Sequence, residues 1–97
     1  MHPNTPPGAA PLRGVALITA IQTDHLRLSP KMQLLAGYCL HHAHTLHRVR
    51  ILELAAQTHN VPSTVVRFAK RYGYTGFHDF KLAFLQEQEV SAWGQPG

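Results

Sequence analysis

The sequence predicts an all-α protein, a compact bundle of about five helices. The chain has 97 residues, which is enough for one small domain but not for two independent cores. Hydrophobic residues make up 44% of the chain, so it can form a packed core. The apolar residues recur at helical spacing, and no segment shows the sustained alternation typical of a strand.

Composition divides the chain into a body and two ends. Residues 1–11 hold four of the seven prolines, so we expect a flexible head there. Residues 12–88 carry the helical periodicity. Residues 89–97 contain two glycines and a proline and are typical of a linker or chain end.

Charge and cysteine content narrow the classes of function. Nine basic residues oppose five acidic ones, and this surplus favours a polyanionic partner, nucleic acid first and an anionic membrane second. The single cysteine, Cys39, excludes an internal disulfide and a multi-cysteine zinc site. The apolar stretch Val15–Ile21 falls far short of the ~20 residues of a membrane helix, and a proline-rich head precedes it instead of a basic start. We therefore interpret it as neither a membrane span nor a signal peptide. We therefore expect a cytoplasmic protein.

The first two helices are predicted from spacing and from a start signal. Leu12–Asp24 places Val15, Ile18 and Ile21 on one side. Ser29-Pro30 starts the second helix, because serine caps free N–H groups and proline suits the first turn. This helix is expected to bury Leu35, Tyr38 and Cys39. Gly37 inside it costs ~1 kcal/mol relative to alanine, so tertiary packing must hold the helix.

Three further helices are predicted in the second half. Ile51–Thr58 offers Leu52, Leu54 and Ala55 to the core and begins after Arg50, a poor cap. Pro62–Tyr72 ends before Gly73, a candidate for the left-handed position after a helix. Thr75-Gly76 opens the last helix, from Phe77 to about Gln88. The inward residues expected on these last two helices are Val65, Phe68, Ala69 and Tyr72, then Phe77, Phe80 and Phe84.

The spacing of two of these helices indicates a function. Only His59-Asn60-Val61 separates Ile51–Thr58 from Pro62–Tyr72, and so short a connector forces the sharp crossing of a helix-turn-helix, here in a homeodomain-like bundle. In that motif the second helix enters the DNA major groove. Any surface helix needs a polar face, but this one carries no acid. Its five polar residues include three cations, the full set being Ser63, Thr64, Arg67, Lys70 and Arg71.

These residues also carry a family resemblance. The chain resembles the N-terminal helix-turn-helix domain of the RpiR/MurR family of bacterial transcriptional regulators from about Leu12 to Gln88. The matching segments are Ile51–Ala55, Ser63–Lys70, Gly73–Phe77 and Phe80-Lys81. The resemblance implies DNA binding, a homodimer and control of sugar or sugar-phosphate genes. It also implies a C-terminal sugar isomerase-like domain that binds the phosphosugar, which nothing after Gln88 can supply.

The sequence departs from the family pattern around the turn. The family usually has a small capping residue where Arg50 stands and glycine where His59 stands. We expect Asn60 to take the left-handed conformation of the turn instead, because asparagine tolerates it.

The predicted helix-turn-helix lets us assign roles to residues at the candidate interface. Ser63 and Arg67 are expected to face bases, whereas Thr64, Lys70, Arg71 and Lys81 are expected to hold phosphates. The partner is double-stranded DNA. The first helix is the expected dimer contact, because Leu17 adds to an apolar set larger than one narrow stripe needs; the alternative is that Leu17 folds back onto the core.

Other functions find less support. The histidines around Cys39, which are His41, His42, His44 and His47, have spacings that can bind zinc or nickel, but no carboxylate supports them nearby. We therefore predict no metal and no other cofactor. No catalytic motif appears, so we predict no enzyme activity. The alternative function is a helical protein-interaction or dimerisation module that has lost DNA binding.

Overall fold

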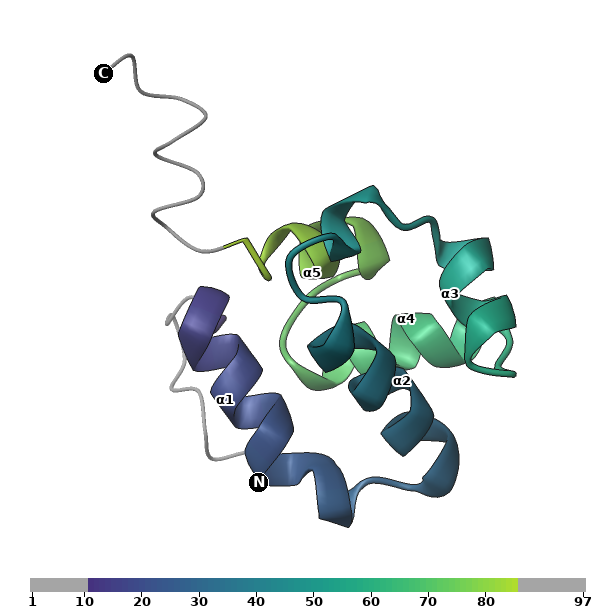
Figure 1. The fold of residues 1–97 in the computed structure, drawn as a ribbon, viewed down its shortest axis with the longest axis horizontal. Helices are drawn as coiled ribbons and strands as arrows, with labels where there is room; N and C mark the ends of the chain where they lie inside the picture. Colours follow the sequence, from purple (N-terminus) through teal and green to yellow (C-terminus); the bar gives the residue numbers. More distant parts are fainter. Residues whose placement is uncertain (1–10, 86–97) are drawn as a thin grey trace.

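A computed structural model describes residues 11–85, and these residues form helices and turns without a strand. The all-α prediction is confirmed. In chain order the elements are α1 (Gly14–Asp24), the 3-10 helix η1 (His25–Arg27), α2 (Pro30–His41), the 3-10 helix η2 (Leu46–Arg48), α3 (Ile51–Gln57), α4 (Pro62–Arg71) and α5 (Phe77–Leu82). Figure 1 shows α1 along one side of the bundle and α2 in the middle. The predicted head, apart from Pro11, and the predicted linker lie outside the described residues, as do residues 86–88, which were predicted to end the fifth helix.

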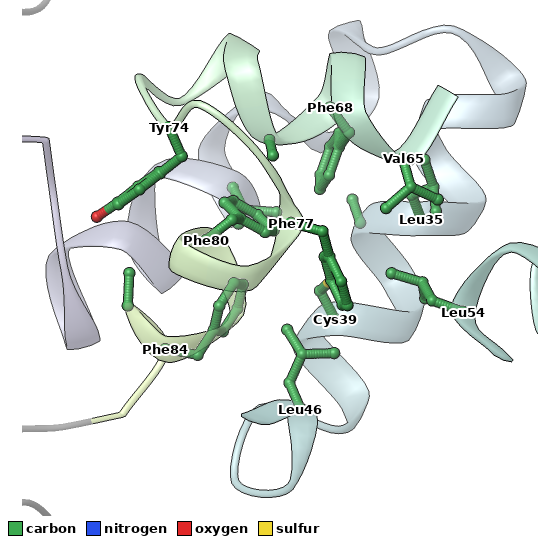
Figure 2. Close-up of a cluster of buried hydrophobic side chains, with 14 of the residues drawn as sticks. Leu35, Cys39, Leu46, Leu54, Val65, Phe68, Tyr74, Phe77, Phe80 and Phe84 are labelled. Carbon is green, nitrogen blue, oxygen red and sulfur yellow. The ribbon is translucent and has the colours of Figure 1, made fainter. Parts of the chain in front are cut away.

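The core is a cluster of rings with aliphatic side chains around it (Figure 2). Phe80 lies at its centre, with its ring centroid 5.6 Å from that of Phe68, 5.8 Å from that of Tyr74 and 5.2 Å from that of Phe84. These pairs meet edge to face, the geometry that aromatic quadrupoles prefer. Because the rings come from α4, α5 and their connections, the core fixes α4 against α5.

The start of α2, the end of α4 and the start of α5 agree with the signals in the sequence. The hydroxyl of Ser29 accepts a hydrogen bond from the Met32 N–H at 3.3 Å, and Pro30 occupies the first turn, as predicted. Gly73 adopts φ +91°, the predicted left-handed position after α4. Gly76 precedes α5, as expected from Thr75-Gly76.

The inward face of α1 was predicted only in part. Leu17 and Ile21 are fully buried, whereas Val15 is 61% exposed and Ile18 is only partly buried. The cause is a contact at the start of the helix. Gly14 is buried, adopts φ +56° and donates its N–H to the carbonyl of Ala83 at 2.6 Å, which sets the rotation of α1 against the end of α5. Leu17 therefore packs on the core of its own chain.

Two smaller expectations are also corrected. Leu52 is 69% exposed, because the inward positions of α3 are those of Leu54, Ala55 and the following Thr58. The fifth helix ends at Leu82, earlier than predicted. The N–H groups of Phe84 and Leu85 donate three residues back, to Lys81 and Leu82, so the helix tightens into a turn there.

Candidate nucleic-acid interface

The turn between α3 and α4 is held by buried polar groups. Thr58 is only 3% exposed, and its hydroxyl donates to the Leu54 carbonyl at 2.8 Å. The Asn60 N–H donates to the Ala55 carbonyl at 2.8 Å, which closes the end of α3. These bonds satisfy groups that the end of a helix otherwise leaves unpaired.

The left-handed residue of this turn is His59, with φ +57°, so the prediction of Asn60 was wrong. The chain must reverse immediately after Thr58, the residue that caps α3, and that is the position at which helices usually adopt this conformation. Asn60 instead stabilises the turn through its side chain. Its side-chain amide donates to the carbonyls of Thr58 at 2.9 Å and Lys31 at 3.3 Å, which ties the turn to α2.

Helix α4 separates its apolar and polar residues onto opposite faces. Val65, Phe68 and Ala69 are buried, as predicted, and Tyr72 is half-buried beyond the helix end. The opposite face contains no acidic residue. Its exposed side chains are Ser63, Arg67, Lys70 and Arg71, with Thr64 partly buried beside them. The structure therefore brings five of the six predicted site residues together on one helix.

The sixth predicted residue, Lys81, lies elsewhere. Its ammonium donates to the Val49 carbonyl at 2.8 Å and lies 5.4 Å from the centroid of the Phe77 ring. These contacts join α5 to the segment before α3. Lys81 is thus engaged within the fold and does not belong to the exposed face of α4.

A link at the far end of α4 was not predicted from the sequence. The Tyr72 hydroxyl donates to the Asp24 carboxylate at 3.0 Å, and the Arg71 guanidinium is near enough to the same phenol to influence its pKa. Burial first, and then Asp24, raise the pKa of Tyr72 to about 12, while Arg71 opposes the shift. Forty-eight residues separate the two partners, so no local pattern could have revealed the bond.

Charge within the described residues is strongly unbalanced. All nine lysines and arginines lie in residues 11–85, but only three of the five acids do, namely Asp24, Glu53 and Asp79. Asp24 is already held by Tyr72. The exposed cations of α4 therefore face solvent with few opposing carboxylates, which favours an anionic partner.

The histidines around Cys39 do not form a metal site within the described residues, and Cys39 belongs to the core. The His42 ring lies 4.2 Å from the Tyr38 ring and 4.8 Å from that of His41, centroid to centroid. Within residues 11–85, no three His, Cys, Asp or Glu side chains gather as metal ligands would. Cys39 is fully buried, and burial raises the pKa of its thiol far above the ordinary value. None of the described helices is long and apolar enough to cross a bilayer.

Comparison with known proteins identifies the family to which this architecture belongs. The helix-turn-helix domain of the rpiR family matches residues 15–91. A solved structure, the N-terminal domain of ybbH, a proposed transcriptional regulator from Bacillus subtilis subsp. subtilis strain 168, shares 30% sequence identity with the chain. The two superpose with a TM-score of 0.63 over 69% of this chain and 82% of that one. No curated protein matches the chain. The match over most of its length shows that the chain belongs to the rpiR family of helix-turn-helix domains.

Proposed function

We propose that this chain is a sequence-specific DNA-binding domain of a bacterial transcriptional regulator. The observation that carries the proposal is the exposed, acid-free face of α4, directly opposite its buried face. Family membership supports it, as does the likeness to the N-terminal domain of a proposed regulator.

Helix α4 is the recognition helix of this proposal. An α-helix with its side chains is ~10–12 Å across, so a major groove ~12 Å wide admits one such helix. Ser63 lies in the first turn of α4 and Arg67 lies about one turn further on, and both face bases. Lys70 and Arg71, in its last turn, bind phosphates together with Thr64.

The wider role follows the family. The regulator acts in the cytoplasm as a homodimer and responds to a sugar phosphate through a C-terminal sugar isomerase-like domain. The domain itself performs no catalysis. Exposed Val15 on α1 and Leu12 just before it supply the apolar surface for the dimer, in place of the buried Leu17.

Selection from random duplexes followed by a salt titration tests the proposal. We expect one enriched motif and a log K that falls linearly with log salt concentration, with a slope of about −0.9 per neutralised phosphate. A chain that enriches no sequence and shows no salt-dependent binding to DNA would instead be the protein-interaction module.

A further inference from the structure

A second group of cations lies outside α4. Arg48 and Arg50 are both exposed and flank the buried Val49. The Val49 carbonyl accepts the hydrogen bond from the Lys81 ammonium, so α5 holds these two arginines and its own lysine in one place. We call Arg48, Arg50 and Lys81 the pre-α3 cluster. Figure 1 shows that this segment lies beside α5, at the opposite edge of the bundle from the connection between α1 and α2.

The two arginines of the pre-α3 cluster, unlike Lys81, have no evident stabilising role in the fold. Arg50 is the cap residue of α3 but makes no capping hydrogen bond. A cation there also opposes the positive end of the helix dipole. Within the described residues, Glu53 and Asp79 are the nearest acids in sequence, and neither forms an ion pair with Arg48 or Arg50. Residues that break a local rule of stability without compensation are expected at functional sites.

We propose that the pre-α3 cluster is a second phosphate-binding surface, which grips the DNA backbone beside the groove that α4 enters. Arg48 and Arg50 are the contacting residues. Lys81 is a positioning residue that fixes the backbone between them, in place of the direct phosphate contact expected from the sequence. The inference rests on the proposed function and extends it to residues outside the recognition helix.

Dimensions favour contact with the backbone. Helix α3 begins directly after Arg50 and ends at the turn that leads into α4. Its seven residues span ~10 Å, close to the ~12 Å width of the major groove. When the start of α4 is in the groove, the other end of α3 therefore lies about one groove width away, where a phosphate strand borders the groove. In a helix-turn-helix the first helix crosses the backbone in this manner.

Arg50→Ser separates a binding role from a structural one. Serine is a good cap, so this variant should melt a few degrees higher than the wild type. Its DNA affinity should nevertheless fall, and the slope of log K against log salt should become shallower by ~0.9. Arg48→Ala should reduce the slope by a similar amount. The loss should be the same on the selected site and on random DNA, because phosphates carry no sequence information.

Two further variants complete the test. Arg27→Ala removes a cation that is also exposed, from η1 at the opposite edge of the bundle, and should leave the slope unchanged. Lys81→Met keeps an apolar stem over Phe77 but loses the bond to Val49. The effect of Lys81→Met on DNA affinity should largely disappear in a protein in which Arg48 and Arg50 are already replaced, because Lys81 acts by positioning those two arginines.

The outcomes distinguish this inference from the proposed function. If the wild type binds its selected site with steep salt dependence but the Arg48→Ala/Arg50→Ser double variant keeps the full slope, the cluster is no phosphate site. An equal loss in Arg27→Ala would likewise overturn the inference, because net charge alone would then explain the change. If the wild type binds no DNA at all, the proposed function itself fails.

Discussion

Phe68 shows how one residue connects the core with the candidate interface. Its ring is fully buried, and its centroid lies 5.4 Å from that of Tyr72 and 5.6 Å from that of Phe80. Arg67, the residue before it, is exposed on the opposite face of α4. The packing of Phe68 therefore determines the direction in which Arg67 points.

We predict that Phe68→Ala costs ~3–5 kcal/mol of unfolding free energy, because it leaves a cavity among rings that cannot close it. So small a domain has little stability to lose, and the variant could unfold. Thermal denaturation followed by circular dichroism measures the effect, with Phe68→Leu as a milder control. A melting temperature that barely moves would mean that α4 is rotated from the described orientation.

Two glycines should respond to alanine in opposite directions. A Cβ built on Gly37 meets nothing within 4 Å, so Gly37→Ala should stabilise α2 by ~0.5–1 kcal/mol through helix propensity. Gly73 adopts φ +91°, and its Cβ would lie 3.4 Å from the Pro11 side chain, so Gly73→Ala should destabilise the fold by ~1–2 kcal/mol. Melting temperatures of the two variants check the pair. A lower melting temperature for Gly37→Ala would contradict the open space beside α2.

At the scale of elements, the bond between Tyr72 and Asp24 joins the end of α1 to the end of α4. Tyr72→Phe keeps the ring contacts and removes only this bond, so we expect a loss of ~1 kcal/mol near neutral pH. DNA affinity should also fall slightly, because Arg71 loses the phenol hydroxyl beside it. Tyr74→Phe is a matched control, since its hydroxyl donates to the Leu12 carbonyl, away from α4.

The same bond predicts a dependence on alkaline pH. The pKa of Tyr72 is raised to about 12 in the folded protein, chiefly by burial and then by Asp24. The resulting stabilisation is present below the ordinary tyrosine pKa of ~10 and is lost as the pH rises from there through 12. Urea denaturation between pH 9 and about 12 should therefore show a smaller loss of stability for Tyr72→Phe than for the wild type. Equal losses in both proteins would remove Tyr72 as a source of this dependence.

Local signals predicted some elements and missed others for physical reasons. Helix α4 was predicted well because its amphipathic spacing and its end at Gly73 are all encoded within a dozen residues. The rotation of α1 depends on the hydrogen bond from Gly14 to Ala83, and the place of Lys81 depends on Val49. Those contacts join residues distant in sequence, so spacing alone could not reveal them.

At the scale of the whole molecule, α1 offers a surface for a second copy. From Gly14 to Thr23 it carries no charged residue, whereas the described chain as a whole is strongly basic. Two such molecules therefore repel each other less through α1 than through the cationic faces. Val15 is 61% exposed there, and Leu12 before it is 46% exposed.

We predict a weak dimer of the isolated domain that tightens on a palindromic site. Sedimentation over a concentration series measures it, and Val15→Glu should shift the protein to monomer. Leu34→Glu, which alters an apolar residue on α2 that is 50% exposed, should leave the association unchanged. A strict monomer at high concentration, with one protein per palindrome, would leave dimerisation to another part of the regulator.

The most direct test of the whole account compares Arg67→Ala with the wild type on the selected site and on random DNA. If the exposed face of α4 reads bases, the variant should lose ~1–3 kcal/mol of binding free energy on the selected site and clearly less on random duplexes. Arg27→Ala, which removes the same charge from η1, should leave the difference in affinity between the selected site and random DNA unchanged. Equal losses on both DNAs for Arg67→Ala would contradict the account, because Arg67 would then bind only phosphates.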